Sequence, residues 1–327
     1  MDLLWRTNTS KMAYVGNDSS STGPHNHVEW QRNLDERLYN PNPEALAFFR
    51  VETGIQDDEE LKTHIFSIQK EAFSICKYPC IRVFEFMTLK MTRVSAYDEV
   101  LKLGRDRKGA IFVDLGCCFG NDSRKLVLDG YPIQNIVAAD LRKVLWDLGH
   151  KLFRSTPQSF PVPFIEGDIF DPTFLTIEPP IPTSSVHINS PLDLRTLTSL
   201  NPLRGQVSAL FAGSFFHLFS FDQQYEIARA LAGLLSPQPG SVLFGLHGAI
   251  AGRGFWQPEG VQYKMACHSP ESWKEMWYEI FGSGEGGDGG IEVRASLVEE
   301  VGGPTFFGTY PENTKPRALL DWVVIRK

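Results

Sequence analysis

The segment AIFVDLGCCFGNDSRKLVLDGY, residues 110–131, constrains the fold more than any other part of the sequence. Its apolar start predicts a buried strand, its glycines predict a turn, and the residues after Gly120 predict a helix. A glycine turn between a strand and a helix brings backbone N–H groups close to a ligand, because glycine has no Cβ to clash. We therefore predict a Rossmann-like α/β domain that binds a ligand at the end of this strand.

Short apolar runs alternate with amphipathic helices through the rest of the chain, which is typical of a parallel sheet with helical crossovers. One helix should begin at Ser220, whose spacing to Gln223 matches a capping box, and SPESWKEMWYEIFG predicts another. IEVRASLVEE and ALLDWVVIRK predict a closing antiparallel hairpin, so we expect a mostly parallel seven-stranded sheet. The five earlier strands are expected at residues 110–115, 135–139, 162–166, 207–212 and 241–246.

Three regions are expected along the chain: a flexible arm (1–24), a helical extension or lid (25–104) and the Rossmann-like cofactor domain (105–327). Pro43 suits the first position of a helix, and the acidic run that begins at Asp57 suits the start of a second. We interpret the run YPCIRVFEFMTLKMTRVSAYDEVL as a helix with one broad apolar face that packs on the main domain. The Pro-rich segment between Ile169 and Gly205 is too long for a plain connection, and we expect an insertion that borders the active site.

Charge and cysteine usage narrow the partners and the compartment. The formal net charge is −7 and no Lys/Arg cluster occurs, which argues against nucleic acid and favours a small-molecule or a protein acceptor. Five cysteines match neither a disulfide framework nor a zinc pattern, so we expect a reducing compartment and no metal. No signal peptide or membrane span is evident, which predicts a cytoplasmic protein. The oligomeric state stays open, a homodimer included.

Acidic residues at three strand ends indicate which ligand is bound. Asp114 would repel a pyrophosphate but can attract the ammonium group of a methionine moiety, which favours S-adenosylmethionine over NAD. Asp140, 26 residues later, can accept both ribose hydroxyls, although capping the helix near Arg142 is the competing interpretation. Asp168 follows the third strand, where a simple Gly-Asp turn is the alternative. An NAD-dependent oxidoreductase is disfavoured because the glycine spacing departs from G-x-G-x-x-G.

These motifs resemble those of class I methyltransferases. With RNLDERLYNPNPEAL and FEFMTLKM, the chain looks like the fungal secondary-metabolite methyltransferases associated with meroterpenoid pathways. The resemblance implies that Asp168 meets the adenine amino group and that Ile169 packs on the ring, whereas Cys118 departs from the family's middle glycine. It also implies O-methylation of the carboxylate of a prenylated aryl polyketide acid, which gives a methyl ester. The cofactor-binding candidates are Asp114, Gly116, Cys117, Gly120, Asp140, Leu141, Asp168, Ile169 and Ser214.

The segment LFAGSFFHLFSFD should border the activated methyl group. Phe215 or Phe216 could stabilise the sulfonium by a cation–π contact, although core packing competes for both. His217 is the candidate general base, against a structural role, and His247 carries the same ambiguity. A carboxylic acid is already ionised at neutral pH and needs no base, whereas a phenol would benefit from one. Adjacent Cys117 and Cys118 are interpreted as packing residues rather than as nucleophiles or a redox pair.

The acceptor-binding residues are less constrained by sequence. Arg82, Arg93, Arg253 and Lys264 are candidate partners of an acidic acceptor, with surface solvation as the alternative. The loop AGRGFWQPEGVQYKM adds Phe255, Trp256 and Tyr263, which suit a flat apolar acceptor with one anionic group. We hypothesise that the N-terminal helices and this loop close over the acceptor. Phenol O-methylation with a histidine base and a non-catalytic cofactor-binding regulator are the remaining alternatives.

Overall fold

The computed structural model describes residues 33–182, 192–257, 264–282, 290–299 and 318–327. The predicted arm (1–24), Tyr263 and part of the Pro-rich segment lie outside these residues. Within the described part of the chain, no helix is both long enough and apolar enough to cross a membrane.

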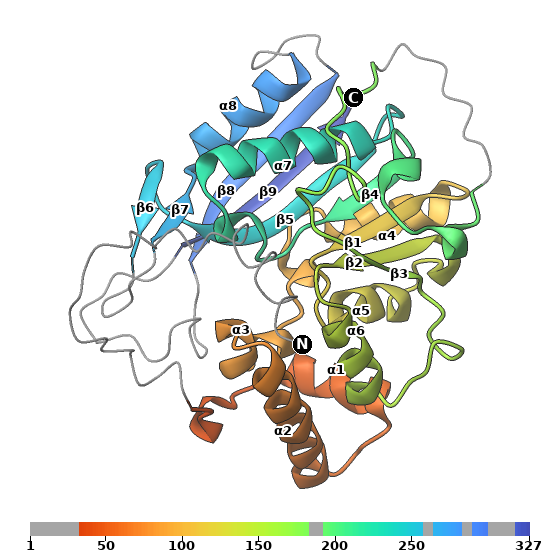
Figure 1. The fold of residues 1–327 in the computed structure, drawn as a ribbon, viewed down its shortest axis with the longest axis vertical. Helices are drawn as coiled ribbons and strands as arrows, with labels where there is room; N and C mark the ends of the chain where they lie inside the picture. The colour runs from red at the N-terminus through yellow and green to blue at the C-terminus, as the bar shows by residue number, and fades with distance from the viewer. Residues whose placement is uncertain (1–32, 183–191, 258–263, 283–289, 300–317) are drawn as a thin grey trace, which may run out of the picture.

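A seven-stranded sheet with the order β3-β2-β1-β4-β5-β9-β8 forms the centre of the molecule, as predicted (Figure 1). The first five strands are parallel, and β9 is antiparallel to both β5 and β8. The chain runs outward from β1 to β3 and then returns to the other side of β1 as β4, so the strand order reverses between β1 and β4. Such a reversal opens a crevice at the carboxyl ends of the strands. The strands are β1 (Ile111–Leu115), β2 (Ile136–Asp140), β3 (Phe164–Glu166), β4 (Val207–Phe211), β5 (Val242–Ala249), β8 (Ile291–Glu299) and β9 (Ala318–Arg326).

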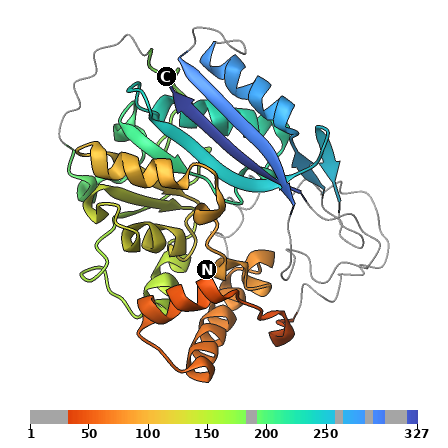
Figure 2. The same cartoon turned by 180° about the vertical axis from the view of Figure 1, so that it is seen from behind.

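Helices cover both faces of the sheet. α7 (Phe221–Leu234) and α8 (Pro270–Phe281) share one hydrophobic core with the sheet. α4 (Tyr97–Asp106), α5 (Asn121–Leu128) and α6 (Lys143–Leu152) bury side chains in a second core on the opposite face, and Figure 2 shows α4 there from behind. α7 begins with the predicted Ser220–Gln223 capping box, which satisfies its first backbone N–H groups.

The N-terminal extension packs tightly on the main domain. α1 (Pro43–Thr53) has Pro43 at its first turn and Asn42 as its cap, and α2 (Asp58–Ile75) is capped by Asp57, as the sequence predicts. A third core joins these helices to the segment around Phe119 and to α6. The extension therefore shares a hydrophobic core with the main domain.

The prediction of a single helix across residues 78–101 is wrong. The chain there forms α3 (Pro79–Arg82), two 3-10 turns (Glu85–Met87 and Met91–Arg93) and then α4. Phe84 adopts a left-handed conformation with φ of 58°, which ends α3. Side chains before residue 90 fill the extension core, whereas those from Met91 onward fill the core on the sheet. Two separate cores cannot be reached from one straight helix, and tertiary packing overrides the apolar periodicity.

Two loops also differ from expectation. The segment after β5, predicted as a loop, contains a small antiparallel pair, β6 (Gly254–Trp256) and β7 (Met265–Cys267). In the described part of the Pro-rich segment, Leu194, Leu200 and Leu203 are buried in the sheet core. That part packs on the sheet, whereas its start, Ile169 to Phe174, reaches the pocket described below.

Candidate functional site

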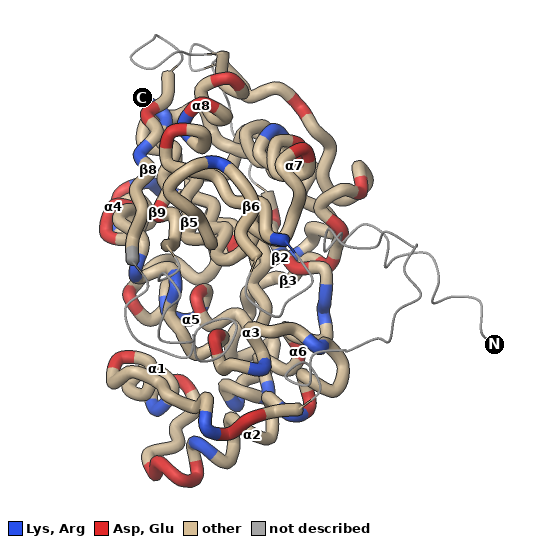
Figure 3. Tube along the Cα trace, turned by 90° about the vertical axis from the view of Figure 1, so that its left-hand side faces the viewer, with Lys and Arg blue, Asp and Glu red and all other residues tan. Residues whose placement is uncertain are grey.

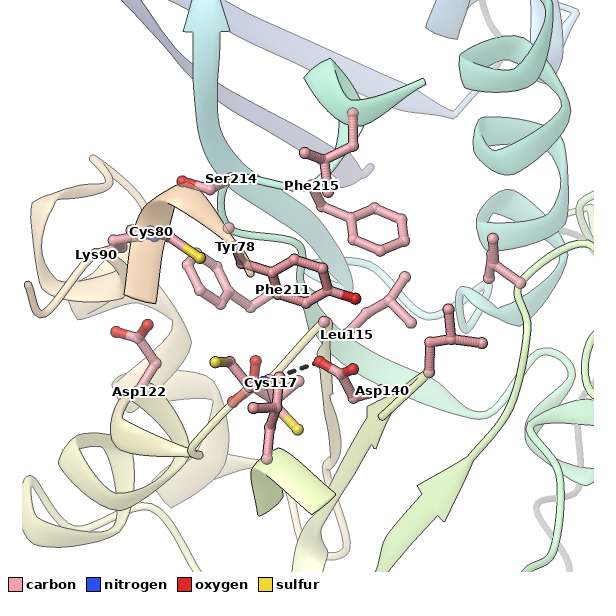
Figure 4. A pocket seen from close by; sticks show the side chains of 18 of the residues that line it. Tyr78, Cys80, Lys90, Leu115, Cys117, Asp122, Asp140, Phe211, Ser214 and Phe215 are labelled. Carbon is pink, nitrogen blue, oxygen red and sulfur yellow. Dashed lines mark hydrogen bonds between the residues drawn. The ribbon is translucent and has the colours of Figure 1, made fainter. Parts of the chain in front are cut away.

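A pocket lies at the carboxyl ends of β1, β2 and β4, where the strand order reverses, and residues 78–90 of the extension close its other side (Figure 4). Of the predicted cofactor residues, all except Gly120 line it. One side of the pocket is therefore formed by the predicted strand-end residues. The other side is formed by residues 78–90, which the sequence predicts as part of a single helix.

The turn after β1 is shaped by glycines and by a buried carboxylate. Asp114 is buried, and its Oδ2 accepts a hydrogen bond of 2.6 Å from the Ser123 hydroxyl. Gly116 has φ of +73°, and a Cβ there would come within 2.9 Å of the Phe215 ring. A Cβ on Gly120 would approach Trp146 to 2.5 Å, so this glycine permits packing beneath the turn and does not line the pocket. Both glycines are needed for close approach, but only Gly116 faces the ligand space.

Burial changes the charge behaviour of this turn. Burial, followed by repulsion from Asp122, raises the pKa of Asp114 to about 7, although the Ser123 hydrogen bond opposes the shift. Burial raises the pKa of Asp122 to about 6. A cation placed beside these carboxylates would stabilise their ionised forms, so the turn favours a positively charged ligand.

Asp140, at the end of β2, holds the turn and also faces the pocket. Its Oδ2 accepts a hydrogen bond of 2.9 Å from the backbone N–H of Cys118, and its Oδ1 accepts one of 2.9 Å from Arg142 N–H. The second bond closes a turn before α6, whose N-cap residue is Arg142 rather than Asp140. A carboxylate has about four acceptor sites, so these two bonds leave capacity for ligand hydroxyls. The turn and the ligand interpretation are therefore compatible.

Asp168 and Ile169 follow β3 and line the same pocket together with Leu141. Asp168 Oδ1 accepts a hydrogen bond of 3.0 Å from the backbone N–H of Phe170, which is the Asx turn weighed as the alternative. The turn therefore presents Ile169 and Phe170 to the ligand space beyond β2.

Ser214, after β4, adopts a left-handed conformation with φ of 51°, rare for a residue other than glycine. Its backbone N–H donates to the Leu246 carbonyl at 2.7 Å, which holds the strained residue in place. The neighbouring wall is aromatic: Phe215 and Phe219 lie with ring centroids 5.1 Å apart, and both line the pocket with Phe211. Strained backbone of this kind concentrates at functional sites.

The predicted histidine base does not face this pocket. His217 is buried and is not among the lining residues that the structure describes; its Nδ1 accepts a hydrogen bond from Gly248 N–H at 3.1 Å. His247 is also buried, and its Nδ1 accepts from the Trp322 indole at 3.0 Å. The geometry gives both histidines structural roles, because each supports the junction of β5 with its neighbours.

The cationic acceptor candidates also lie elsewhere. Arg82 donates to the Asn33 carbonyl at 3.0 Å, Arg253 stacks on Phe221, and Arg93 and Lys264 are exposed. None of the described residues of the loop after β5 lines the pocket. Figure 3 shows Lys and Arg residues interspersed with Asp and Glu along the described chain.

The sequence analysis missed the wall supplied by the extension. Tyr78, Cys80, Glu85, Phe86 and Lys90 all line the pocket. Lys90 is the one Lys or Arg among the described lining residues, and its Nζ lies 3.1 Å from Glu85 Oε1. The charges in FEFMTLKM were the available signal, because a Glu and a Lys inside an apolar run need a partner when buried.

The pocket fits S-adenosylmethionine. Five lining carboxylates, those of Glu85, Asp114, Asp122, Asp140 and Asp168, suit a ligand that carries a sulfonium and an ammonium group. The close approach at Gly116 suits a ligand held against backbone. The strand order, the acidic strand ends and the glycine turn together define a class I S-adenosylmethionine-dependent methyltransferase.

Comparisons with known proteins identify the family. A family model described as the meroterpenoid methyltransferase N-terminal domain matches residues 33–87. O-methyltransferase phiE from a fungal species is 30% identical over 254 residues, covering 77% of this chain and 75% of that protein. Asnovolin E/Chermesin D methyltransferase nvfJ of Aspergillus novofumigatus is 32% identical over 246 residues, covering 75% and 79%. The chain belongs to the family of fungal secondary-metabolite methyltransferases that these relatives represent.

Solved structures with a similar fold include a 1,6-didemethyltoxoflavin-N1-methyltransferase from Burkholderia thailandensis. It is 10% identical, with a TM-score of 0.43, and the match covers 84% of this chain and 92% of that one.

Proposed function

We propose that this methyltransferase transfers the methyl group of S-adenosylmethionine to the carboxylate of a small aryl or polyketide-derived acid and forms a methyl ester. The observation that carries the proposal is the composition of the pocket. None of the lining residues that the structure describes is a histidine, and the acceptor side is formed by aromatic rings. An acceptor that is already ionised fits this wall better than a phenol, which needs a base.

The apolar wall also favours a reaction in which two opposite charges are neutralised. Transfer from a sulfonium to a carboxylate converts a cation and an anion into a neutral thioether and a neutral ester. The rings of Phe211, Phe215 and Phe219 line the pocket and would shield both charges from water. Opposite charges attract more strongly in such surroundings, and positioning can contribute about 7 to 11 kcal/mol.

The cofactor residues receive the following proposed roles. Asp140 accepts hydrogen bonds from the ribose hydroxyls, Asp168 meets the adenine amino group, and Leu141 and Ile169 pack on the adenine ring.

Asp114 faces the cationic methionine end, and Gly116 and Cys117 provide the backbone against which the cofactor lies. Ser214 borders the transferred methyl group, and Gly120 acts indirectly by allowing Trp146 to pack under the turn.

Two relatives guide the choice of acceptors. One is named as an O-methyltransferase, and another is named for asnovolin E and chermesin D. We propose that this chain also takes a secondary-metabolite acceptor, with the extension forming a fixed wall of its site.

The experiment that tests the proposal uses three matched acceptors and methyl-labelled S-adenosylmethionine. The first is a phenolic aryl acid, the second its methyl ester, and the third its phenol methyl ether with the acid free. Labelling of the first and third, released by mild alkali, supports carboxylate methylation. Alkali-stable label on the ester would show phenol methylation instead. Cofactor binding without transfer to any acid or phenol in a broad library would support the non-catalytic alternative.

A further inference from the structure

A partly buried ion pair, Glu85–Lys90, projects from the extension into the cofactor pocket. Lys90 Nζ lies 3.1 Å from Glu85 Oε1, and both side chains are 16% exposed. Glu85 Oε2 is buried and receives no hydrogen bond from the described residues. Two largely desolvated charges in an apolar wall are costly unless they meet further partners. The pair therefore requires an explanation beyond stability.

The pair lies at a defined end of the pocket. Ser214 Oγ, after β4, is 3.5 Å from Glu85 Oε1, and Met91 N–H donates to Asp122 on the first turn of α5 at 2.9 Å. Asp168, after β3, marks the opposite end, with Asp140 between them along the sheet. Figure 4 shows Lys90 and Asp122 on one side of the pocket and Asp140 toward the other. The pair thus lies over the β1–β4 junction, beyond the proposed ribose position.

The surroundings of Lys90 keep its ammonium group charged. Burial opposes the charge on Lys90, but Glu85, Cys80 and Asp122 outweigh it and raise the pKa of the ammonium group. Lys90 can donate three hydrogen bonds, and Glu85 can accept on two oxygens. Together they offer one cation and one anion to whatever occupies this end of the pocket.

We propose that Lys90 and Glu85 bind the zwitterionic amino-acid end of the cofactor, with Lys90 donating to its carboxylate and Glu85 accepting from its ammonium group. The amino-acid end of the cofactor carries one positive and one negative group, which are complementary to Glu85 and Lys90. On binding, each of these two residues exchanges its contact with the other for a contact with the cofactor. The extension thereby contributes directly to cofactor affinity.

The competing assignment is that Lys90 holds the carboxylate of the acceptor. The two assignments differ in which ligand binds more weakly when Lys90 is replaced. Calorimetric titration without acceptor separates them, because it reads cofactor affinity alone. A failure here leaves the proposed carboxylate methylation to be judged by its own labelling experiment.

The test titrates four forms of the protein with three probes. The forms are wild type, Lys90→Met, Glu85→Gln and Lys77→Met, whose exposed Lys77 lies outside the pocket and serves as a matched control. The probes are S-adenosylhomocysteine, decarboxylated S-adenosylmethionine, which lacks the carboxylate, and 5′-methylthioadenosine, which lacks the whole amino-acid end.

We expect Lys90→Met to weaken the binding of S-adenosylhomocysteine at least tenfold. The binding of the two probes without a carboxylate should weaken less than threefold. Glu85→Gln should weaken both probes that carry an amine and leave methylthioadenosine within threefold. Lys77→Met should change nothing. Equal weakening of all three probes would overturn the proposal in favour of a structural role. An unchanged affinity for S-adenosylhomocysteine with a raised acceptor KM would overturn it in favour of the acceptor assignment.

Folding is checked by thermal unfolding and circular dichroism. If Lys90→Met does not fold, the Lys90→Gln variant and the wild-type affinities still decide the question. Wild type should bind S-adenosylhomocysteine at least tenfold more tightly than methylthioadenosine, and equal affinities would contradict the proposal.

Discussion

The two halves of the pocket are built in different ways. The strand-end half, with Asp114, Asp140 and Asp168, is fixed by the register of β1, β2 and β3 and by glycine turns. The extension half, residues 78–90, consists of one turn of helix and one 3-10 turn, and its apolar side chains pack in the extension core. The first half provides acidic groups in a general cofactor frame, whereas the second adds the Glu85–Lys90 pair and aromatic surface. The contrast shows that strand ends and an irregular segment place different kinds of chemical group around one pocket.

The largest effect is expected in the strand-end half. Asp140→Ala should weaken S-adenosylhomocysteine about 100-fold or more, because it removes two charge-assisted bonds of about 1.5 to 3 kcal/mol each. It also leaves the Cys118 N–H without its carboxylate partner. Calorimetry measures the loss, and Asp147→Ala, at an exposed position of α6, is the control. A change of less than fivefold would remove Asp140 from the cofactor site.

In the extension half, we expect a substitution to lower the free energy of unfolding. Gln69 is buried, and its Nε2 donates to the carbonyls of Ile81 and Arg82 at 3.0 and 2.9 Å. Gln69→Ala removes the buried side-chain donor to both carbonyls beside the pocket wall, and we expect a loss of about 2 kcal/mol in unfolding free energy. Denaturant unfolding checks this value. Gln56→Ala, an exposed glutamine that also donates to a backbone carbonyl, should cost less than about 0.5 kcal/mol.

The pH dependence of cofactor binding sharpens the comparison further. The pKa of Asp114 is raised to about 7 by burial, so this group is increasingly protonated below neutrality. Because the cationic end of the cofactor favours the ionised form, affinity should fall as pH drops, by about tenfold from pH 7 to pH 6 at most. Titrations with S-adenosylhomocysteine between pH 6 and 8 measure the slope. Asp114→Asn should flatten it, and an unchanged slope in that variant would assign the titration to another group.

The smallest effect is expected at Cys118, where the family pattern has glycine. Cys118 has φ of 52°, a conformation that glycine adopts without strain. Cys118→Gly should therefore be tolerated, with stability within about 1 kcal/mol and cofactor affinity within about threefold, since only the backbone N–H contacts Asp140. A large loss of binding would show that the thiol itself has a role at the cofactor.

The strand-end half could be predicted from sequence because its signals are local. Apolar runs end in an acidic residue, and the parallel topology then brings Asp114, Asp140 and Asp168 to one edge. The extension half could not be predicted, because Phe84 adopts a left-handed conformation that sequence periodicity does not encode. Glu85 and Lys90 lie inside the run predicted as one helix, and only the fold shows that they meet in the pocket. The sequence also could not show that His217 is buried outside the pocket lining, where its Nδ1 accepts from Gly248 N–H.

The most direct test of the account is a crystal structure of the protein with S-adenosylhomocysteine. We predict the ribose at Asp140, the adenine between Asp168 and Ile169, and the amino-acid end at Glu85 and Lys90. Such a complex would show both halves of the pocket acting on one ligand. A ligand bound outside the β1–β4 junction, or one whose amino-acid end points away from the extension into solvent, would contradict the account.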